Sequence, residues 1–505
     1  MTFAPVEDPV EGVQGRHPAV VAEAVARTAR SPRVLVGIAN YGEKNRPYLD
    51  RLIAEYRSMP FPVDICVFSE KPKPYPAGVT VHVGLPIGNP WSLPFAHRPV
   101  FAAKADDYDL FIYSEDDTLI EARHIAAFLD AAQSLAAGLV PGFIRYEQRA
   151  DGTHSYPDIH GAYRWIADSV ARSGAYTHAR LTNDHSACYL LTRDQLRAAI
   201  ASSGYLVEPH GGRYDMLCSA GTDPYTQCGL SRVICISHLE DFEIHHLPDA
   251  YVKGNGMINK DCAVLERDGL LCQLEALAAI HAGELGGGQA FDTEKALPTQ
   301  RWDKSYYEPR DDALLARVPA TATRVLSIGC GSGRTEAHLV GAGKQVVAIP
   351  LDAVIGRIAE RSGIRVMTPD LALALAQLQG SRFDAILLPG VVQHLADPVE
   401  LLRRLSTLLA PAGVIVGSAP NLGLLRRWSG RLFGKNSQGY RLHGRWQTSK
   451  LHLTSARGLG LWITRAGLRV RQITVPRELK VNAPAPLATL MAPTLYFVAE
   501  RTSSD

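Results

Sequence analysis

The sequence predicts an α/β protein built from two Rossmann-like α/β domains. The chain has 505 residues, which is more than one hydrophobic core usually organises. Short apolar strands alternate with helical stretches in two separate series, which is the pattern of layered α/β folds. No internal repeat relates the two series, so each half needs its own functional interpretation.

Composition excludes several classes of partner and site. Hydrophobic residues make up 46% and charged residues 21%, and a formal net charge of +2 provides no general attraction to nucleic acid. Glu7 and Asp8 stand where a signal peptide would need basic and then apolar residues, and no apolar run approaches membrane-spanning length. The eight cysteines show no zinc-ligand spacing, which favours buried thiols in a reducing compartment. We therefore expect a cytoplasmic protein without a transmembrane segment, a structural zinc or a nucleic-acid partner.

A leader precedes the first domain. Residues 1–30 contain an alanine-rich stretch, His17–Arg30, that predicts a short helix. The first strong strand is Arg33–Ala39, and strands and helices then alternate as far as about Tyr251. This region is expected to form the first α/β layer structure.

A helix and a glycine run separate the two halves. A helical pattern covers about Asp261 to Ala282, and Gly286–Gly288 follows it as a flexible run typical of linkers. We place the boundary near residue 290. The expected organisation is a leader at 1–30, a first domain at 31–260, a linker at 261–300 and a second domain at 301–505.

An acidic triplet follows one strand of the first domain. The apolar strand Leu110–Tyr113 leads into Glu115, Asp116 and Asp117. Three neighbouring carboxylates at a strand end repel one another unless a cation lies among them. A hard divalent ion takes carboxylate oxygens and keeps phosphate oxygens in its shell, which suits a nucleotide diphosphate as leaving group. The alternative interpretation is a solvated acidic turn.

The triplet resembles the acidic DxD signature of GT-A glycosyltransferases, in its Glu-Asp-Asp form. The resemblance covers about Arg33 to Tyr251, and it implies Mn²⁺ or Mg²⁺ held by Glu115, Asp117 and a late histidine. His246 is the first choice for that histidine and His245 the second. In the competing interpretation the paired histidines are structural, because neutral imidazole packs and hydrogen-bonds readily.

The same resemblance implies a nucleotide-binding loop and a transfer reaction. Ala39 and Asn40 follow the first strand, where a GT-A fold contacts its nucleotide. The donor would be a nucleotide-diphosphate sugar, and the acceptor would be a hydroxyl of a glycan or of another molecule. The enzyme would then be a glycosyltransferase of the EC 2.4 class.

An inverting reaction also needs a carboxylate that takes the proton of the acceptor. Asp223 and Asp215 are the catalytic candidates. In the alternative interpretation, Thr222–Pro224 caps a helix with proline at its first position. The run Asn183–Ser186 either lines the acceptor pocket or forms a turn.

Three glycines follow the first strand of the second domain. The strand that starts at Arg324 leads into Gly329, Gly331 and Gly333, which let the backbone approach a ligand before the next helix begins. This run resembles the first motif of class I S-adenosylmethionine methyltransferases, and Phe383–Leu402 resembles their fourth motif with the helix after it. Further strands are expected at Gln345–Ile349, Phe383–Leu388 and Gly413–Gly417.

The cofactor contacts depart from the methyltransferase pattern. Ser327 stands where that family usually carries an acid, and Pro350 stands where a second acid usually holds the ribose hydroxyls. Proline has no side-chain acceptor, so the second contact is lost. Asp352 is a candidate substitute, and Asp370, which would approach the adenine, is retained. Three hypotheses remain: weakened S-adenosylmethionine binding, binding rescued by Asp352, and a domain that serves only as a scaffold.

A basic segment interrupts the second domain. Leu424–Lys450 carries many Arg and Lys residues, interleaved with Leu, Trp and Phe, and no acid. Such a composition can give peripheral contact with a membrane surface or with a phosphorylated glycan carrier. The interpretation that we favour is a substrate-covering insertion, which the resemblance to the methyltransferase family implies.

Two hypotheses of different classes follow. The main hypothesis is a metal-dependent glycosyltransferase whose second domain methylates the glycan or is degenerate. The alternative is an S-adenosylmethionine-dependent methyltransferase of the EC 2.1.1 class whose first domain only binds a saccharide or a partner protein. A non-enzymatic binding protein made from two decayed enzyme folds is a third hypothesis.

Overall fold

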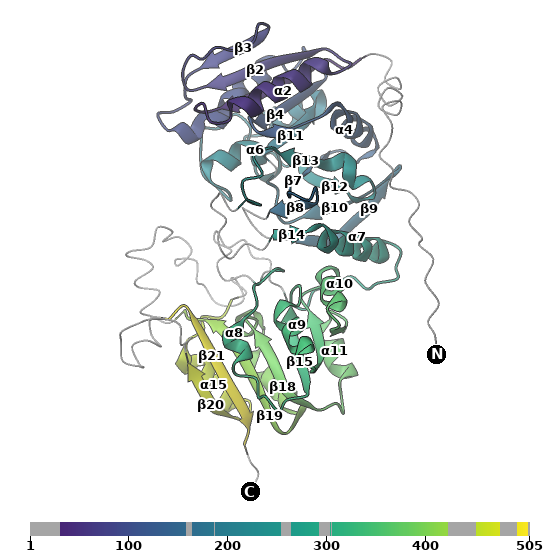
Figure 1. The fold of residues 1–505 in the computed structure, drawn as a ribbon, viewed down its shortest axis with the longest axis vertical. Helices are drawn as coiled ribbons and strands as arrows, with labels where there is room; N and C mark the ends of the chain where they lie inside the picture. The colour runs from purple at the N-terminus through teal and green to yellow at the C-terminus, as the bar shows by residue number, and fades with distance from the viewer. Residues whose placement is uncertain are drawn as a thin grey trace. The chain divides into compact units, whose positions relative to one another are not determined.

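The computed structural model divides the chain into two compact units, shown in Figure 1. Unit 1 comprises Met1–Tyr156 and Ala171–Gly256, and unit 2 comprises Pro157–Val170 and Met257–Asp505. The helix expected at His17–Arg30 and the basic segment Leu424–Lys450 lie outside the described residues. The structure describes residues 31–157, 164–185, 187–253, 264–291, 304, 306–422, 451–474 and 492–502.

Unit 1 is built around a five-stranded sheet with the order β11-β4-β1-β2-β3. Strands β1 to β4 pair in parallel, whereas β11 pairs antiparallel with β4. The central strands β1 and β4 are buried along almost their whole length, as strands covered on both faces usually are. The strands are β1 (Val34–Asn40), β2 (Val63–Ser69), β3 (Val79–Val83), β4 (Leu110–Glu115) and β11 (Cys188–Thr192).

Helices of unit 1 turn apolar faces toward this sheet. In α2 the buried side chains recur every three or four positions, which places them on one face: Leu49, Leu52, Ile53 and Tyr56. The helices are α2 (Arg46–Ser58), η1 (Pro90–Ala96), α3 (His97–Ala103), α4 (Ala122–Ser134), α5 (Arg193–Ala201), α6 (Met216–Thr226) and η2 (Ile236–Phe242).

Shorter strands complete unit 1, although residues 165–170 of β9 are assigned to unit 2. One sheet has the order β6-β12-β10-β9, and in another β13 pairs with both β5 and β7. The antiparallel pairing of β13 with β5 sets His246 opposite Thr118, so this histidine lies beside the end of the acidic triplet. The strands are β5 (Thr118–Leu119), β6 (Leu139–Pro141), β7 (Ile144–Gln148), β8 (His154–Pro157), β9 (Trp165–Ser173), β10 (Tyr176–Leu181), β12 (Ser231–Cys235) and β13 (Glu243–His246).

Unit 2 contains a seven-stranded sheet with the order β17-β16-β15-β18-β19-β21-β20. The strands from β17 to β19 pair in parallel, and β21 is antiparallel to both β19 and β20. The order reverses between β15 and β18, and open α/β sheets bind ligands at the carboxyl ends of the strands at such a switch point. The strands are β15 (Arg324–Cys330), β16 (Gln345–Pro350), β17 (Arg365–Val366), β18 (Phe383–Pro389), β19 (Leu409–Pro420), β20 (Leu468–Thr474) and β21 (Thr494–Arg501).

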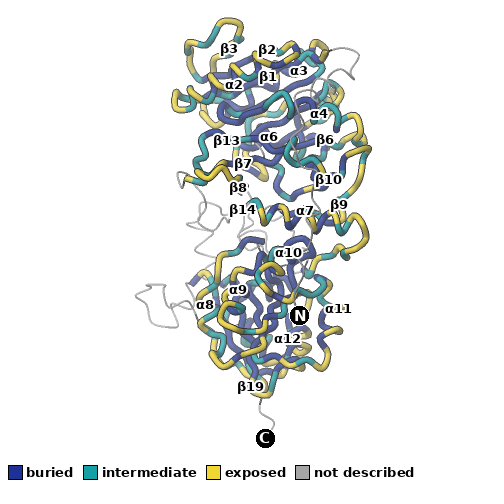
Figure 2. Tube along the Cα trace, turned by 45° about the vertical axis from the view of Figure 1, so that its right-hand side comes forward, coloured by how far each residue is buried: buried dark blue, intermediate teal, exposed yellow. Residues whose placement is uncertain are grey.

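Helices pack along the sheet of unit 2. Helix α9 contacts β16, α12 contacts β19 and α15 contacts β20, while α7 packs on α10. Figure 2 shows the central strands of each unit as buried and the turns as largely exposed. The remaining elements are β14 (Val264–Glu266), α7 (Arg267–His281), α8 (Asp312–Leu315), α9 (Arg334–Gly341), α10 (Ala353–Arg361), α11 (Leu371–Gln377), η4 (Val392–His394), α12 (Pro398–Ser406) and α15 (Ala456–Arg465).

The expected α/β architecture of the second half is confirmed. The strands that the sequence predicts there correspond to β15, β16, β18 and β19. The helix expected as a linker is α7, which the contacts with α10 join to unit 2. Within the described ranges, no helix combines the length and the apolar character needed to span a bilayer.

Candidate functional site

Two members of the acidic triplet of unit 1, Asp116 and Asp117, are buried and hydrogen-bonded to asparagines. Asn40 Nδ2 donates to Asp116 Oδ2 at 2.6 Å. Asn45 Nδ2 donates to Asp116 Oδ1 at 2.7 Å and to Asp117 Oδ2 at 3.0 Å. Asp116 and Asp117 are only 6% and 8% exposed, so the interpretation of the triplet as a solvated turn is wrong. Asn40 ends β1 and Asn45 precedes α2, which brings the loop after the first strand against the triplet.

Burial and mutual repulsion make it costly for these carboxyl groups to carry a negative charge. Burial and the nearby Asp117 raise the pKa of Glu115 to about 8, and the same two causes raise the pKa of Asp116 to about 6. Asp117 Oδ1 is buried and accepts no hydrogen bond. A buried carboxylate oxygen without a partner is costly, so this atom is the natural contact for a cation or a donor.

His246 lies between two carboxylates. Its Nε2 is 3.5 Å from Asp117 Oδ2, and its Nδ1 is 2.6 Å from Glu147 Oε1. Glu147 Oε2 accepts the backbone N–H groups of Tyr251 and Val252, which fixes that carboxylate. Burial lowers the pKa of His246, but the hydrogen bonds to Asp117 and Glu147 outweigh burial and raise it. A carboxylate that orients a histidine in this way is common around metal-binding histidines.

The structure assembles the predicted metal ligands only in part. Asp117 and His246 are neighbours, whereas Glu115 acts on both through its charge. His245 stacks on Tyr146, and its Nε2 lies 2.9 Å from Asp249 Oδ1. Within the described part of the chain, no three acid, histidine or cysteine side chains are arranged to hold a metal ion together.

The predicted catalytic aspartates occupy different places on α6. Asp215 is the N-cap of this helix, and its Oδ1 accepts the backbone N–H of Cys218 at 2.9 Å. Asp223 lies inside the helix, is 1% exposed, and pairs with Arg98 Nη2 at 2.8 Å and with His210 Nε2 at 3.0 Å. The interpretation in which Asp223 caps the helix start is wrong, because Asp215 holds that position.

Pro224 fits inside α6 because another residue satisfies the carbonyl that proline leaves open. Proline has no N–H, so the carbonyl of Ala220, four positions earlier, receives no helical hydrogen bond from it. Arg98 Nη2 donates to that carbonyl at 3.0 Å. The same guanidinium therefore completes the helix and neutralises Asp223.

In unit 2 the glycine loop lies at the switch point of the sheet. Gly329 and Gly333 have positive φ angles of 81° and 79°. A Cβ on Gly333 would meet Ala359, so this glycine permits close packing at the start of α9. A Cβ on Gly329 would lie 2.5 Å from Val391 Cγ1 and 2.9 Å from Phe291 Cε2. The side chains of Val391 and Phe291 therefore pack directly against the backbone of Gly329.

A cavity of about 20 Å³ lies at this loop and has room for about one water molecule. Gly331 and Gly333 line it together with Glu336, from the first turn of α9. Ser327 Oγ donates to Glu336 Oε1 at 2.6 Å, and burial raises the pKa of this carboxyl group. The first turn of α9 thus places a carboxyl group beside Ser327.

The residues that follow β16 are engaged by contacts within the protein. Pro350 ends β16, and Asp352 Oδ1 caps α10 by accepting two backbone N–H groups at 2.9 and 3.0 Å. The hydroxyl of Tyr306 donates to Asp352 Oδ2, and Arg164 Nε lies 3.9 Å from the same oxygen. Asp352 is 1% exposed, so the fold engages both of its carboxylate oxygens.

Part of unit 2 matches a known protein family. A family profile described as a methyltransferase domain matches residues 300–473. That range contains the glycine loop and the sheet from β15 to β20. Unit 2 contains a methyltransferase domain.

The methyltransferase domain has curated relatives over part of their length. The ubiquinone biosynthesis O-methyltransferase of Cereibacter sphaeroides is 37% identical over 120 residues, which cover 22% of this chain and 47% of that protein. The enzyme of the same name from Xanthomonas campestris pv. campestris is 33% identical over 121 residues, which cover 22% and 49%. The chain therefore spans about half the length of these curated relatives.

A solved structure is also similar to this region. The S-adenosylmethionine-dependent methyltransferase from Mesorhizobium loti is 20% identical, with a TM-score of 0.29. The similarity covers 37% of this chain and 96% of that one. The family match is confined to residues 300–473, so the GT-A resemblance of unit 1 stays a prediction.

Several residues around the methyltransferase loop are not found by sequence reasoning. Glu336 has a detectable signal, since an acid in the first turn of a helix suits the positive end of the helix dipole. The sequence around Arg164 and Tyr306 gives no such signal, because their contacts with Asp352 join distant parts of the chain. Asp370, predicted near the adenine, is exposed and is the N-cap of α11.

Proposed function

We propose that the methyltransferase domain binds S-adenosylmethionine at the glycine loop after β15 and methylates a hydroxyl group of a small acceptor. One observation carries the proposal: the family match covers a glycine loop that lies at the switch point of an open α/β sheet. The two relatives described above are O-methyltransferases, which supports a hydroxyl as the acceptor. This function corresponds to the alternative hypothesis drawn from the sequence.

The loop residues fit one end of this cofactor. The buried Glu336 carboxylate and the backbone of Gly331–Gly333 offer an acceptor and donors for its charged amino-acid group. When bound, S-adenosylmethionine supplies a methyl group on a positively charged sulfur, from which an acceptor oxygen can take it. The role of Glu336 is to orient the cofactor through its amino group.

The ribose end fits poorly. Pro350 provides no acceptor, and Asp352 is held by α10 and Tyr306. A cavity of about 20 Å³ is much smaller than the cofactor, so lining side chains such as Lys304 must move when it binds. Of the three sequence hypotheses, we therefore favour weakened binding over rescue by Asp352.

Titration calorimetry of the full chain with S-adenosylhomocysteine tests this function. We expect binding that Glu336→Gln weakens by about tenfold or more, the usual effect of losing a hydrogen bond to a charged group. Glu360→Gln, an exposed substitution on α10, is the matched control and should leave binding unchanged. If neither S-adenosylmethionine nor S-adenosylhomocysteine binds at millimolar concentration, the domain is a scaffold and the proposal is wrong.

A second function, sugar transfer in unit 1, is favoured by one specific observation. The unpartnered Oδ1 of buried Asp117 lies in a carboxylate beside His246, whose other nitrogen is held by Glu147. The described residues provide two ligands for Mn²⁺ or Mg²⁺, Asp117 and His246, and phosphate oxygens commonly fill the other positions on such ions. The ion would neutralise the diphosphate of a leaving nucleotide. Asn40 would contact the nucleotide from the end of β1.

A thermal-shift experiment separates this function from methylation. Uridine, guanosine and thymidine diphosphates are each added to the full chain with and without Mn²⁺. We expect a stabilisation that requires the metal and one of these nucleotides, and that Asp117→Asn abolishes. Asp194→Asn, on the exposed surface of α5, is the control. A metal-dependent shift that survives in Asp117→Asn would rule out this site, and it would not affect the methyltransferase proposal.

A further inference from the structure

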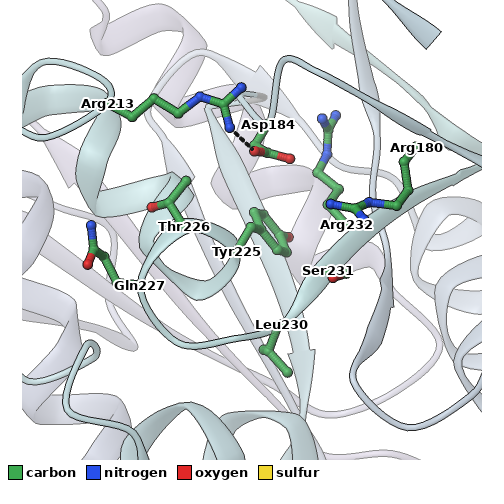
Figure 3. Close-up of a pocket in the computed structure, with 9 residues that line it drawn as sticks. All are labelled: Arg180, Asp184, Arg213, Tyr225, Thr226, Gln227, Leu230, Ser231 and Arg232. Atoms are coloured by element: carbon green, nitrogen blue, oxygen red, sulfur yellow. Dashed lines mark hydrogen bonds and ion pairs between the residues drawn. The ribbon is translucent and has the colours of Figure 1, made fainter. Parts of the chain in front are cut away.

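A separate cavity of about 280 Å³ lies in unit 1 and is shown in Figure 3. Its walls come from β10, the loop before β11, the loop before α6, the end of α6 and the start of β12. Polar side chains dominate these walls, including Thr226, Gln227 and Ser231. Neither of the sites described above uses this cavity.

Three arginines from three elements meet at the cavity. Arg180 belongs to β10, Arg213 to the loop before α6 and Arg232 to β12. Among the described residues that line the cavity, Asp184 is the one acid, against three arginines. Figure 3 shows the Asp184 carboxylate between Arg213 and Arg232.

Arg232 is fixed in the wall as a charged group. Its side chain is 4% exposed and packs so closely on Gly142 that a Cβ there would lie 2.5 Å from Arg232 Cγ. It donates to the backbone carbonyls of Asn183, at 2.9 Å, and of Phe143. Both acceptors are neutral, and the buried Nε has no hydrogen-bond partner. The positive charge of Arg232 is therefore not cancelled by these contacts.

Asp184 is the acidic side chain that faces the three arginines. Arg213 Nη1 lies 3.0 Å from its Oδ2, and the side chain is 17% exposed. Burial raises the pKa of Asp184, and the charges of Arg232, Arg213 and Arg180 oppose this rise. All three arginines and this carboxylate line the same cavity.

We propose that this cavity binds a small polar ligand through an oxyanion group, a phosphate or a carboxylate, held by Arg180, Arg213 and Arg232. Clustered cations repel one another, and this repulsion is relieved when an anion binds among them. The guanidinium fork matches the oxygens of phosphate and carboxylate, which Arg binds with paired hydrogen bonds. A cavity of about 280 Å³ exceeds the size of a bare anion, so the polar wall can contact the rest of the ligand.

Titration calorimetry of the full chain tests the proposal with two probes, glucose 1-phosphate and glucuronate. We expect at least one to bind, and which of them binds more tightly distinguishes a phosphate from a carboxylate ligand. Arg180→Gln and Arg213→Gln should each weaken binding by about tenfold. Asp184→Asn should tighten it, because the substitution removes the negative charge of the one acid among the described lining residues. These opposite effects are specific to an anion site.

A matched control and two negative outcomes complete the test. Arg197→Gln, which removes an exposed arginine that pairs with Asp106 on the surface, should leave binding unchanged. Circular dichroism and thermal melting of each variant identify any loss of fold. If neither probe binds the native protein at millimolar concentration, the proposal is overturned. It is also overturned if a folded variant carrying both Arg180→Gln and Arg213→Gln binds as tightly as the native protein.

Discussion

At the residue scale, a buried histidine couples the stability of unit 1 to pH. His97 is fully buried, and its ring stacks on Tyr113 at a centroid distance of 4.2 Å. Its two nitrogens are bonded to the carbonyl of Pro94 and the hydroxyl of Tyr189. Burial, together with the neighbouring Arg98, holds the pKa of His97 well below its ordinary value of 6.5. Just below pH 6.5, the imidazole of His97 therefore stays neutral in the folded protein, whereas it is protonated in the unfolded chain.

We predict that the contribution of His97 to the free energy of unfolding is lost in acid. It is fully present above the ordinary pKa of 6.5 and decreases below it, because the unfolded state then binds more protons. The slope reaches about 1.4 kcal/mol per pH unit at most. His97→Gln removes this dependence, so urea unfolding at several pH values should give a shallower slope below neutrality. Equal slopes for the variant and the native protein would contradict the assignment.

Gly329 is a second position where one residue decides the local structure. Its φ is 81°, and a Cβ would lie 2.5 Å from Val391 Cγ1 and 2.9 Å from Phe291 Cε2. Gly329→Ala should lower the free energy of unfolding of unit 2 by about 1–3 kcal/mol, through backbone strain and overpacking. Gly341→Ala, at the end of α9 with open space around it, is the control. In thermal melting, the Gly341→Ala protein should be as stable as the native protein or more stable, because alanine has a higher helix propensity than glycine.

At the scale of elements, Arg98 connects α3 to α6. This arginine is 2% exposed and pairs with Asp223, which is 1% exposed. It also donates to three backbone carbonyls, those of Tyr205, Ser219 and Ala220. The burial of the pair and its number of hydrogen bonds favour a structural role for Asp223, whereas a general base needs access to an acceptor.

Asp223→Ala is expected to lower the free energy of unfolding by about 3–5 kcal/mol, because it leaves the charge of Arg98 buried without a partner. Asp106→Ala breaks the exposed pair with Arg197 and should leave the free energy of unfolding almost unchanged. Chemical denaturation of both variants measures the difference. A folded Asp223→Ala protein of native stability that has lost sugar transfer would support the catalytic role instead.

The sequence predicts elements better than it predicts contacts between them. Strands β4 and β15 are predictable because each is an apolar run that ends in acids or glycines. The start of α6 is missed, because Pro224 suggests a helix beginning whereas Arg98 allows proline in the last turn. The neighbourhood of Asp117 and His246 follows from the family resemblance. No local pattern predicts it, since it depends on the two-residue strand β5.

The contacts of Asp352 show the same limit. Its position after β16 suggests a cofactor ligand, but an aspartate before a helix is also a good N-cap, and the structure has it as the cap of α10. Its partner Tyr306 precedes the first strand of this sheet in the sequence. Its other partner, Arg164, lies in the first half of the sequence. Such pairings depend on the tertiary fold, which a single sequence does not reveal.

At the scale of the whole molecule, the two compact units should respond to different ligands. We predict two transitions in scanning calorimetry, because each unit has its own sheet and hydrophobic core. S-adenosylhomocysteine should raise only the transition of unit 2, since a ligand stabilises the unit whose native state binds it. Glucose 1-phosphate should raise only the transition of unit 1, which contains the cavity lined by arginines. A single transition that both ligands shift together would show that the units unfold as one.

The segment Pro157–Val170 has a consequence for how the protein is made. It belongs to unit 2 although unit 1 surrounds it in the sequence. During synthesis Arg164 leaves the ribosome 125 residues before Gln289, with which it bonds, and earlier still than Asp352. The contacts of Arg164 with Gln289 and Asp352 can therefore form only after the rest of unit 1 has been synthesised. A gene fragment that starts at Met257 would encode the methyltransferase domain without the guanidinium that flanks Asp352.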